Sequence, residues 1–245
     1  MNRLTVINDL VQQKKLDKYL EIGVHDGGIF FRVSSSHKVA VDPKFLFGKF
    51  NTWGKVFNFP HNLSNRYFEV TSDEFFEKHA AKAFEAVKPN MIFIDGMHEY
   101  HYVLRDVENT LKYMPEGGVI VVHDCSPKTK ESAALYDEWK ATGFKGLWNG
   151  DVWKAMVHLR SMRNDINVMV LDCDHGLGII TKGKAVDMLP FTQQQIEAMT
   201  FADLAANREK WLNLKKPEYF YEHFNITNRR ARSLRTVIRK VVKGK

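Results

Sequence analysis

The chain has 245 residues, of which 44% are hydrophobic and 27% are charged. This length is sufficient for one α/β domain with additions at its ends. No apolar run is long enough to cross a bilayer, residues 1–18 are too polar for a signal peptide, and the two cysteines show no metal-ligand spacing. We therefore expect a cytoplasmic protein with reduced cysteines.

The net charge of +7 originates in the carboxyl-terminal segment. Eight basic residues and no acidic residue lie in residues 229–245, which leaves the rest of the chain close to neutral. A broad nucleic-acid-binding face on the folded domain is therefore not expected. The basic segment is either a solvated terminus or a basic amphipathic helix that makes weak contact with an anionic membrane.

The first half of the chain predicts a ligand-binding turn between two strands. After a short helix in residues 1–18, strands are predicted at Tyr19–Val24 (YLEIGV) and Lys38–Val41. Between them, His25-Asp26-Gly27-Gly28 forms a turn, and the apolar stretch Ile29–Val33 begins a helix. A strand, a glycine-containing turn and a helix bring backbone N–H groups to a nucleotide-like ligand, although the glycines could also only close a tight turn.

Polar residues follow the next two predicted strands. Asp42 comes directly after the second strand, where a carboxylate can accept hydrogen bonds from ribose hydroxyls. Glu69–Asp73 is interpreted as a strand end that leads into a helix over Glu74–Val87. Ser72 or Asp73 either caps that helix or contacts an adenine ring at the same edge of the sheet.

The segment Met91–Cys125 predicts two parallel strands joined by a helix. Short apolar runs at Met91–Ile94 and Val119–Val122 are typical of strands buried on both faces, and apolar residues recur at helical spacing between them. In such sheets ligands bind outside the carboxyl ends of the strands. Four polar residues that can bind metal or transfer protons fall there: Asp95, His98, His123 and Asp124.

The second half of the chain completes the predicted sheet. A helix containing Trp139 is expected, followed by a helix with Asp151 as its N-cap. The close spacing of Ile166–Leu171 and Gly178–Thr181 predicts an antiparallel hairpin at the sheet edge, and residues 184–228 are expected to add helices. The fold class is therefore α/β, Rossmann-like and doubly wound.

Together, these residues resemble class I S-adenosylmethionine-dependent methyltransferases, and in particular the branch that contains macrocin O-methyltransferase and related sugar O-methyltransferases. The resemblance covers about residues 19–182 and is carried by YLEIGV with its following GG, VAVDP, TSDEFF, FIDGMHEY, LRDVENTLKYMPEGGVIVVHDC, GDVWKA and LDCDHGLGII. It implies a mostly parallel sheet of seven strands with an antiparallel last strand. We therefore expect an N-terminal helical extension over residues 1–18, a catalytic domain over 19–183, a helical addition over 184–228 and a basic tail over 229–245.

The resemblance also implies where S-adenosylmethionine binds. Asp42 would hold the ribose of this cofactor, and Ser72 with Asp73 would lie near its adenine. The full set of residues implied to border the cofactor is Glu21, Gly23, Gly27, Asp42, Ser72, Asp73 and Asp95.

A metal site and a general base are implied in the same way. In sugar-methylating relatives the Asp of a D-x-x-H motif, here Asp95, binds magnesium, and its His, here His98, is the proposed base. Two further acids supply metal ligands there, and this chain has His123 and Asp124 at those positions. A histidine in place of an acid makes the site softer than an all-oxygen site. His123 can join it only if the strand has already ended, because neighbouring side chains of a strand point to opposite faces.

The sequence therefore predicts methyl transfer from S-adenosylmethionine to a hydroxyl group on a sugar, a glycan or another small acceptor, with or without a divalent metal such as magnesium. Two alternatives stay open. A metal-dependent hydrolase could use the four residues at the strand ends, but it leaves the cofactor-like first half unexplained. A noncatalytic binding module could be tethered to an anionic surface through the tail. Acceptor specificity is expected to lie in residues 45–68 and 184–228.

Overall fold

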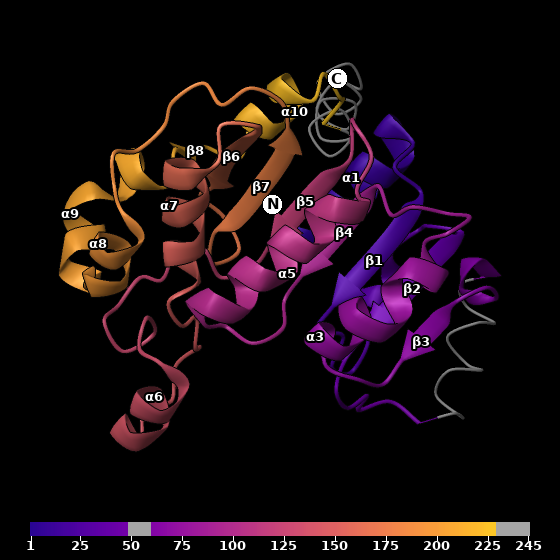
Figure 1. Cartoon of the computed structure of the whole chain (residues 1–245), viewed down its shortest axis with the longest axis horizontal. Helices are drawn as coiled ribbons and strands as arrows, with labels where there is room; N and C mark the ends of the chain where they lie inside the picture. Colours follow the sequence, from indigo (N-terminus) through magenta and orange to yellow (C-terminus); the bar gives the residue numbers. More distant parts are fainter. Residues whose placement is uncertain (49–59, 229–245) are drawn as a thin grey trace, which may run out of the picture.

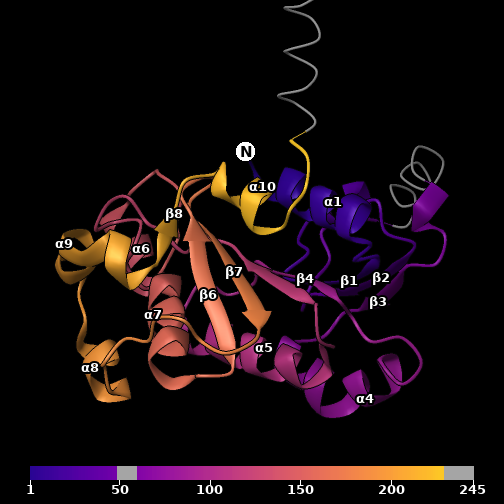
Figure 2. The same ribbon diagram turned by 90° about the horizontal axis from the view of Figure 1, so that it is seen from above.

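The computed structural model describes residues 1–48 and 60–228. A central sheet separates two layers of helices (Figure 2). Helices α1 (Arg3–Lys14) and α10 (Tyr219–His223) lie on one face, and α5 (Tyr100–Tyr113) and α7 (Val152–Met162) lie on the other. Within the described ranges, none of the helices combines the length and the apolar character needed to cross a bilayer.

The described part of the sheet has eight strands in the order β3-β2-β1-β4-β5-β7-β6-β8 (Figure 1). β7 is antiparallel to both of its neighbours, β5 and β6, whereas the other paired strands are parallel. The strands are β1 Lys18–Ile22, β2 His37–Val41, β3 Arg66–Phe68, β4 Met91–Ile94, β5 Val119–Val122, β6 Ile166–Leu171, β7 Leu177–Lys182 and β8 Leu214–Lys215. The predicted Rossmann-like α/β fold is confirmed.

Two details of the predicted sheet are wrong. The hairpin is antiparallel as expected, but it does not form the edge, because β8 lies outside β6. The two-residue strand β8 pairs with β6 and adds an eighth strand outside the expected seven. Strand β8 forms where the chain crosses back from α9 (Phe201–Trp211), and two backbone hydrogen bonds fix it: Val170 N–H to Leu212 O and Asp172 N–H to Lys215 O.

The helical elements also differ from the sequence-based expectation in places. The stretch Ile29–Val33 forms only a 3-10 turn, η1 (Phe30–Arg32), because the chain must return to β2 at His37. The helix expected at Glu74–Val87 is divided into α3 (Ser72–Glu74), a π-helical turn η3 (Phe75–His79) and α4 (Ala80–Ala83). The remaining elements are η2 Pro60–Asn62, α6 Tyr136–Thr142 and α8 Gln193–Ala198.

The two faces of the sheet support separate hydrophobic cores, as the period of two in a strand requires. In β1, Leu20 and Ile22 pack into the core on the α5 side, and Tyr19 packs into the core on the α1 side. Val103 and Val107 form part of the apolar face of α5 that covers the sheet. Packing in these cores fixes the positions of the parallel strands along their axes, so that the strand ends meet at one edge of the sheet.

The loops after β1 and β4 approach each other most closely at Gly23. Its φ is +83°, and a Cβ atom added there would lie 2.2 Å from the backbone oxygen of Asp95. Gly117 has a similar φ of +76°, but an added Cβ atom would meet nothing within 4 Å. The two glycines therefore share the same backbone strain and differ in crowding.

We expect Gly117→Ala to lower the free energy of unfolding by about 1–2 kcal/mol, the cost of left-handed backbone alone. Gly23→Ala should cost at least about 2 kcal/mol more, since backbone atoms rather than a rotatable side chain are in the way. Urea denaturation of both variants measures the difference. Equal losses would contradict the close approach of the two loops.

Candidate active site

The carboxyl ends of β1, β2, β4 and β5 meet at one edge, which we call the carboxyl rim. The sheet ladder continues one residue past the strands: Gly23 N–H donates to Val41 O (2.9 Å), Asp95 N–H to Ile22 O (2.9 Å) and His123 N–H to Ile94 O (3.0 Å). The residues that follow neighbouring strands are therefore held side by side. This is the edge at which the sequence predicted a ligand.

Asp42 organises the turn that follows β1. Its Oδ2 accepts hydrogen bonds from the backbone N–H groups of Val24 and His25, both at 2.8 Å, and its Oδ1 accepts one from Lys44 N–H, also at 2.8 Å. Only 8% of Asp42 is exposed. Oδ1 accepts only this one hydrogen bond among the described residues and keeps a second acceptor position, so a ribose contact stays a prediction. The structure adds a role in shaping the turn, which the sequence did not indicate.

Glu21 lies below the rim rather than on it. It is 1% exposed, and the hydroxyl of Tyr19 donates a hydrogen bond to its carboxylate. Burial, with a contribution from the nearby charge of Asp95, raises the pKa of Glu21 to about 8. Glu21 is therefore protonated at neutral pH.

Ser72 and Asp73 are both tied to α5. Asp73 forms an ion pair with Arg105 (2.9 Å), and Ser72 is hydrogen-bonded to Asp106. The N-cap of α3 is Thr71, whose hydroxyl accepts from Glu74 N–H at 3.2 Å, so the expected capping by Ser72 or Asp73 is wrong. Thr71 takes this role because it is the last extended residue before the helix.

The four polar residues predicted at the strand ends form one cluster. His123 Nδ1 lies 3.0 Å from Asp95 Oδ1 and 2.8 Å from Asp124 Oδ2. His98 bridges the same two carboxylates, with Nε2 3.4 Å from Asp95 Oδ1 and Nδ1 3.2 Å from Asp124 Oδ2. Two acids and two imidazoles thus share a space at the ends of β4 and β5.

The backbone at Asp124 explains why His123 can join the cluster. β5 ends at Val122, and Asp124 adopts a left-handed conformation with φ +61°. Aspartate tolerates this conformation better than most residues do. The break turns the side chains of His123 and Asp124 toward each other. The strand has therefore ended before His123, which is the condition under which the sequence allowed His123 to join the site. The side-chain amide of Asn149 donates to the other oxygen of Asp124.

Arg3 and Asp174 also belong to the cluster, and sequence reasoning missed both. Arg3 Nη1 lies 2.8 Å from Asp95 Oδ2, and its Nε lies 3.0 Å from Asp174 Oδ2. The backbone N–H of Arg3, at the start of α1, donates to the same Asp174 oxygen at 2.7 Å. Asp174 comes from the turn between β6 and β7. The helix expected as a separate N-terminal extension therefore contributes its first side chain to the rim.

The acidic and basic side chains of the cluster shift one another's pKa values. Burial alone would raise the pKa of Asp95, but His123 and His98 outweigh it and hold that pKa well below its usual range. Burial would likewise lower the pKa of His123, but the surrounding carboxylates raise it to about 11. The pKa of His98 is also raised, mainly by Asp95 and Asp124, which outweigh its burial.

Asp95, His98 and Asp124 can supply metal ligands. One ligand atom of each lies within 4.8 Å of the others. This set contains His98 in place of His123, which the sequence had placed among the ligands. His123 Nδ1 instead lies between the two carboxylates as a counter-charge, and its Nε2 has no hydrogen-bond partner in the described residues. Two carboxylates and one imidazole suit a divalent ion of intermediate softness, such as Mn²⁺, as well as Mg²⁺.

The His98 loop is held by a segment from the start of α7. The carbonyl of Trp148 lies 3.1 Å from His98 Nδ1. Asp151 occupies the N-cap position of α7, as the sequence suggested, but its side chain makes no cap hydrogen bond there. Its Oδ1 instead accepts from Tyr100 N–H at the start of α5, at 2.6 Å. The φ of Gly150 is +63°, and a Cβ atom there would overlap the carbonyl oxygen of His98.

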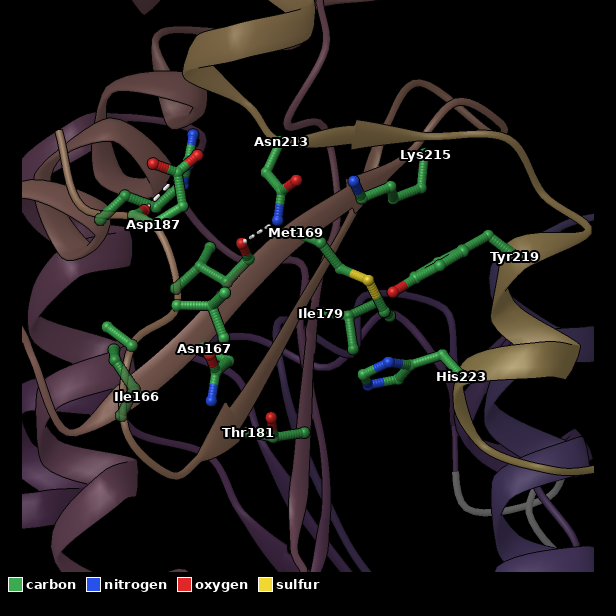
Figure 3. A pocket seen from close by; sticks show the side chains of 14 residues that line it. Ile166, Asn167, Met169, Ile179, Thr181, Asp187, Asn213, Lys215, Tyr219 and His223 are labelled. Atoms are coloured by element: carbon green, nitrogen blue, oxygen red, sulfur yellow. Dashed lines mark hydrogen bonds and ion pairs between the residues drawn. The ribbon is translucent and has the colours of Figure 1, made fainter.

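A cavity of about 410 Å³ lies elsewhere, on the α10 side of the β6–β7 hairpin (Figure 3). Met169 and Ile179 form part of its floor, and Lys215, Tyr219 and His223 form one side. None of the site residues predicted from the sequence lines it. The predicted catalytic and cofactor-binding residues therefore lie away from this cavity.

Comparison with known proteins agrees with this geometry. Residues 20–125 match the family model described as a methyltransferase domain. No match was found among curated proteins. Similar solved structures include the O-methyltransferase TomG from Streptomyces achromogenes, involved in tomaymycin synthesis and solved with SAM (12% identity, 74% of this chain and 79% of that chain, TM-score 0.55). Two others were solved with SAH: an O-methyltransferase from Bacillus cereus (13%, 74% and 80%, 0.51) and the methyltransferase PaMTH1 from Podospora anserina (13%, 74% and 78%, 0.54).

These comparisons confirm the predicted class. Residues 20–125 match a methyltransferase-domain model, and the chain has the fold of class I S-adenosylmethionine-dependent methyltransferases. The family model covers the segment from β1 to the end of β5, which contains the glycine turn and most of the carboxyl rim.

The buried carboxyl of Asp106 gives a testable pH dependence. Burial raises its pKa to about 7, and its Oδ1 has no hydrogen-bond partner among the described residues. The folded state therefore keeps a proton that the unfolded state releases above about pH 4, so stability falls as the pH rises from about 4 to about 7.

Asp106→Asn mimics the protonated acid and should remove this dependence. We expect the variant to exceed the wild type in free energy of unfolding at pH 8 by on the order of 1–4 kcal/mol, with little difference at pH 4. Urea titrations at the two pH values measure this, with the exposed Asp137→Asn as control. A variant that is less stable than the wild type at pH 8 would argue against a buried proton on Asp106.

Proposed function

We propose that this protein transfers a methyl group from S-adenosylmethionine to a hydroxyl oxygen of a small hydroxylated acceptor. The observation that carries the proposal is the position of the Asp95–His98–Asp124 cluster beside the Gly23 turn, on one rim of a methyltransferase domain. The O-methyltransferases named among the similar structures support the same chemistry. The resemblance to sugar-methylating enzymes favours a sugar or glycan acceptor.

The cofactor is proposed to bind over the glycine turn. S-adenosylmethionine supplies an electrophilic methyl group when bound. Gly23 has no side chain, so the loop after β4 packs directly against the turn. Asp42 fixes the shape of the turn by accepting hydrogen bonds from the N–H groups of Val24 and His25. Asp42 is proposed to hold the ribose, and Ser72 with Asp73 to border the adenine. A hydrolase that used only the acids and histidines would give this turn no role.

The residues of the cluster have complementary tasks in methyl transfer. The acceptor oxygen must be aligned and must lose its proton, since the protein contributes little other covalent chemistry. Asp95 and Asp124 are proposed to accept hydrogen bonds from the acceptor hydroxyls, and His98 to take the proton. The same carboxylates that raise the pKa of His98 also favour the imidazolium that this step forms.

A divalent ion is proposed at Asp95, His98 and Asp124, whose ligand atoms fit one. When bound, such an ion lowers the pKa of a coordinated hydroxyl. His98 then has two candidate tasks, ligand or base. Arg3 and His123 already neutralise part of the carboxylate charge, so the chain itself also offers cations to this site.

Other features of the proposal lie beyond the rim. The basic tail is proposed to make weak contact with anionic membranes, but residues 229–245 lie outside the described part of the chain. Part of the 45–68 segment, expected to shape the acceptor pocket, lies outside it as well. Cys125 and Cys173 are both free, and a cytoplasmic location stays a prediction.

Calorimetry with S-adenosylhomocysteine tests the cofactor, and incorporation of labelled methyl groups into hydroxylated compounds tests the reaction. We expect binding of S-adenosylhomocysteine with or without Mg²⁺ or Mn²⁺, and methyl transfer that falls on chelation. A folded protein that does not bind S-adenosylhomocysteine would refute the proposal.

His98→Ala separates the two tasks of His98. If His98 is the base, kcat should fall about 10²–10⁴-fold, while S-adenosylhomocysteine and Mn²⁺ still bind. Mn²⁺ binding is read by electron paramagnetic resonance. His101→Ala, an exposed histidine three residues further on, is the matched control and should keep full activity. Unchanged turnover in His98→Ala would remove the base assignment, and loss of Mn²⁺ binding would make His98 a ligand.

Arg3→Met tests the charge balance of the rim. Arg3 places a permanent positive charge 2.8 Å from Asp95 Oδ2, which opposes a divalent ion at the same carboxylate. Removing it should tighten Mn²⁺ binding about tenfold, whereas Arg3→Lys should keep the wild-type affinity. Lys14→Met, at the other end of α1, is the control. Weaker Mn²⁺ binding by a folded Arg3→Met variant would show that Arg3 supports the ion site rather than competes with it.

A further inference from the structure

An aromatic surface continues from His98 outward. The rings of His98 and Trp148 are stacked, with centroids 5.0 Å apart and planes at 25°. Trp148 in turn contacts Tyr136, at 5.0 Å, and Trp139, at 6.0 Å, both from α6. We call Tyr136, Trp139 and Trp148 the aromatic platform.

The platform is fixed to the loop that carries His98. The indole N–H of Trp148 donates to Ala134 O at 2.8 Å, and the backbone N–H of Tyr136 donates to a carboxylate oxygen of Glu99 at 3.2 Å. Glu99 directly follows His98 in the chain. The platform therefore keeps its position relative to His98, although α6 itself projects from the body of the molecule (Figure 1).

Apolar side chains around the platform are open to solvent. The exposed fractions are 66% for Leu147, 43% for Leu135 and 38% for both Tyr136 and Met97. Scattered exposed apolar residues need no explanation, but these residues all neighbour platform residues or His98 in the chain. They offer apolar surface to solvent next to the platform and to His98.

We propose that the aromatic platform is the acceptor subsite next to the reacting one. The acceptor is then larger than the ring that is methylated, and a second ring with a flat apolar face lies against Tyr136 and Trp148. The negative faces of these rings attract the C–H groups of a sugar ring or the edge of an aromatic ring. The proposal rests on the proposed methyl transfer.

Continuity with His98 favours the acceptor over a separate protein partner. The rings of Trp148 and His98 are in direct contact, with centroids 5.0 Å apart. A ligand whose hydroxyl faces His98 and Asp124 can therefore extend onto the platform. The hydroxyl-binding rim and the apolar platform then recognise two parts of one molecule.

The test compares acceptors of one ring with acceptors of two rings. Methyl glucoside with methyl maltoside forms the sugar pair, and catechol with the two-ring flavonoid luteolin forms the aromatic pair. Binding to the protein loaded with S-adenosylhomocysteine is measured by saturation-transfer NMR, and KM and kcat are measured where methyl transfer occurs. In one pair, the two-ring compound should bind about tenfold more tightly, with saturation of its second ring. The pair that responds identifies the ring.

Tyr136→Ala and Leu147→Ala should raise KM for the two-ring compound about three- to tenfold, with kcat and the one-ring KM unchanged. Tyr219→Ala is the matched control, since Tyr219 is 37% exposed and lies on α10. Thermal denaturation checks that the variants fold. Equal binding of one-ring and two-ring compounds, or a two-ring preference that survives in Tyr136→Ala, overturns the subsite. A protein that methylates one-ring compounds without a two-ring preference keeps the proposed function and loses only this inference.

Discussion

Carboxylates from three strand ends converge on the carboxyl rim, and the need to neutralise them determines the arrangement around it. His123 lies near all three of Asp95, Asp124 and Asp174, and Arg3 forms ion pairs with Asp95 and Asp174. A buried carboxylate without a partner costs several kcal/mol, because water no longer stabilises its charge. The segments that follow the strands supply two imidazoles, His98 and His123, and a permanent cation comes from elsewhere in the chain. Arg3 provides it from the first turn of α1.

The same charge balance ties the two ends of the domain together. Asp174 binds both the side chain and the backbone N–H of Arg3, so the turn between β6 and β7 fixes the start of α1. That turn contains Asp174 and His175 in left-handed conformations, with φ values of 47° and 64°. The strain costs on the order of 1–3 kcal/mol per residue and persists only where the surroundings hold it. Here the ion pair with Arg3 contributes to holding it.

The elements that the sequence predicted well are those whose signals are local. The apolar runs of β4 and β5 and the helical period of α5 depend on neighbouring residues, and these patterns suffice to place Asp95, His98, His123 and Asp124 at one edge of the sheet. The contact between Arg3 and Asp174 has no local signal, because 171 residues separate the two. The turn at Phe30–Arg32 was predicted to begin a helix. The apolar pattern does not indicate how soon the chain must turn back to the next strand.

The position of His98 shows why its orientation could not be predicted from the sequence. In the sequence, His98 is typical of a loop histidine after a strand. In the structure, three consecutive residues next to the start of α7 contact His98 or its neighbour Asp124. Trp148 stacks on the ring, Asn149 binds Asp124, and Gly150 packs against the His98 carbonyl. These contacts hold the loop at the His98 ring, at the neighbouring Asp124 carboxylate and at the His98 backbone. The imidazole is therefore held in one orientation, as a proton acceptor requires. The segment that orients His98 also begins the aromatic platform, so in the proposed reaction the alignment of the base and the recognition of the acceptor would depend on the same few residues.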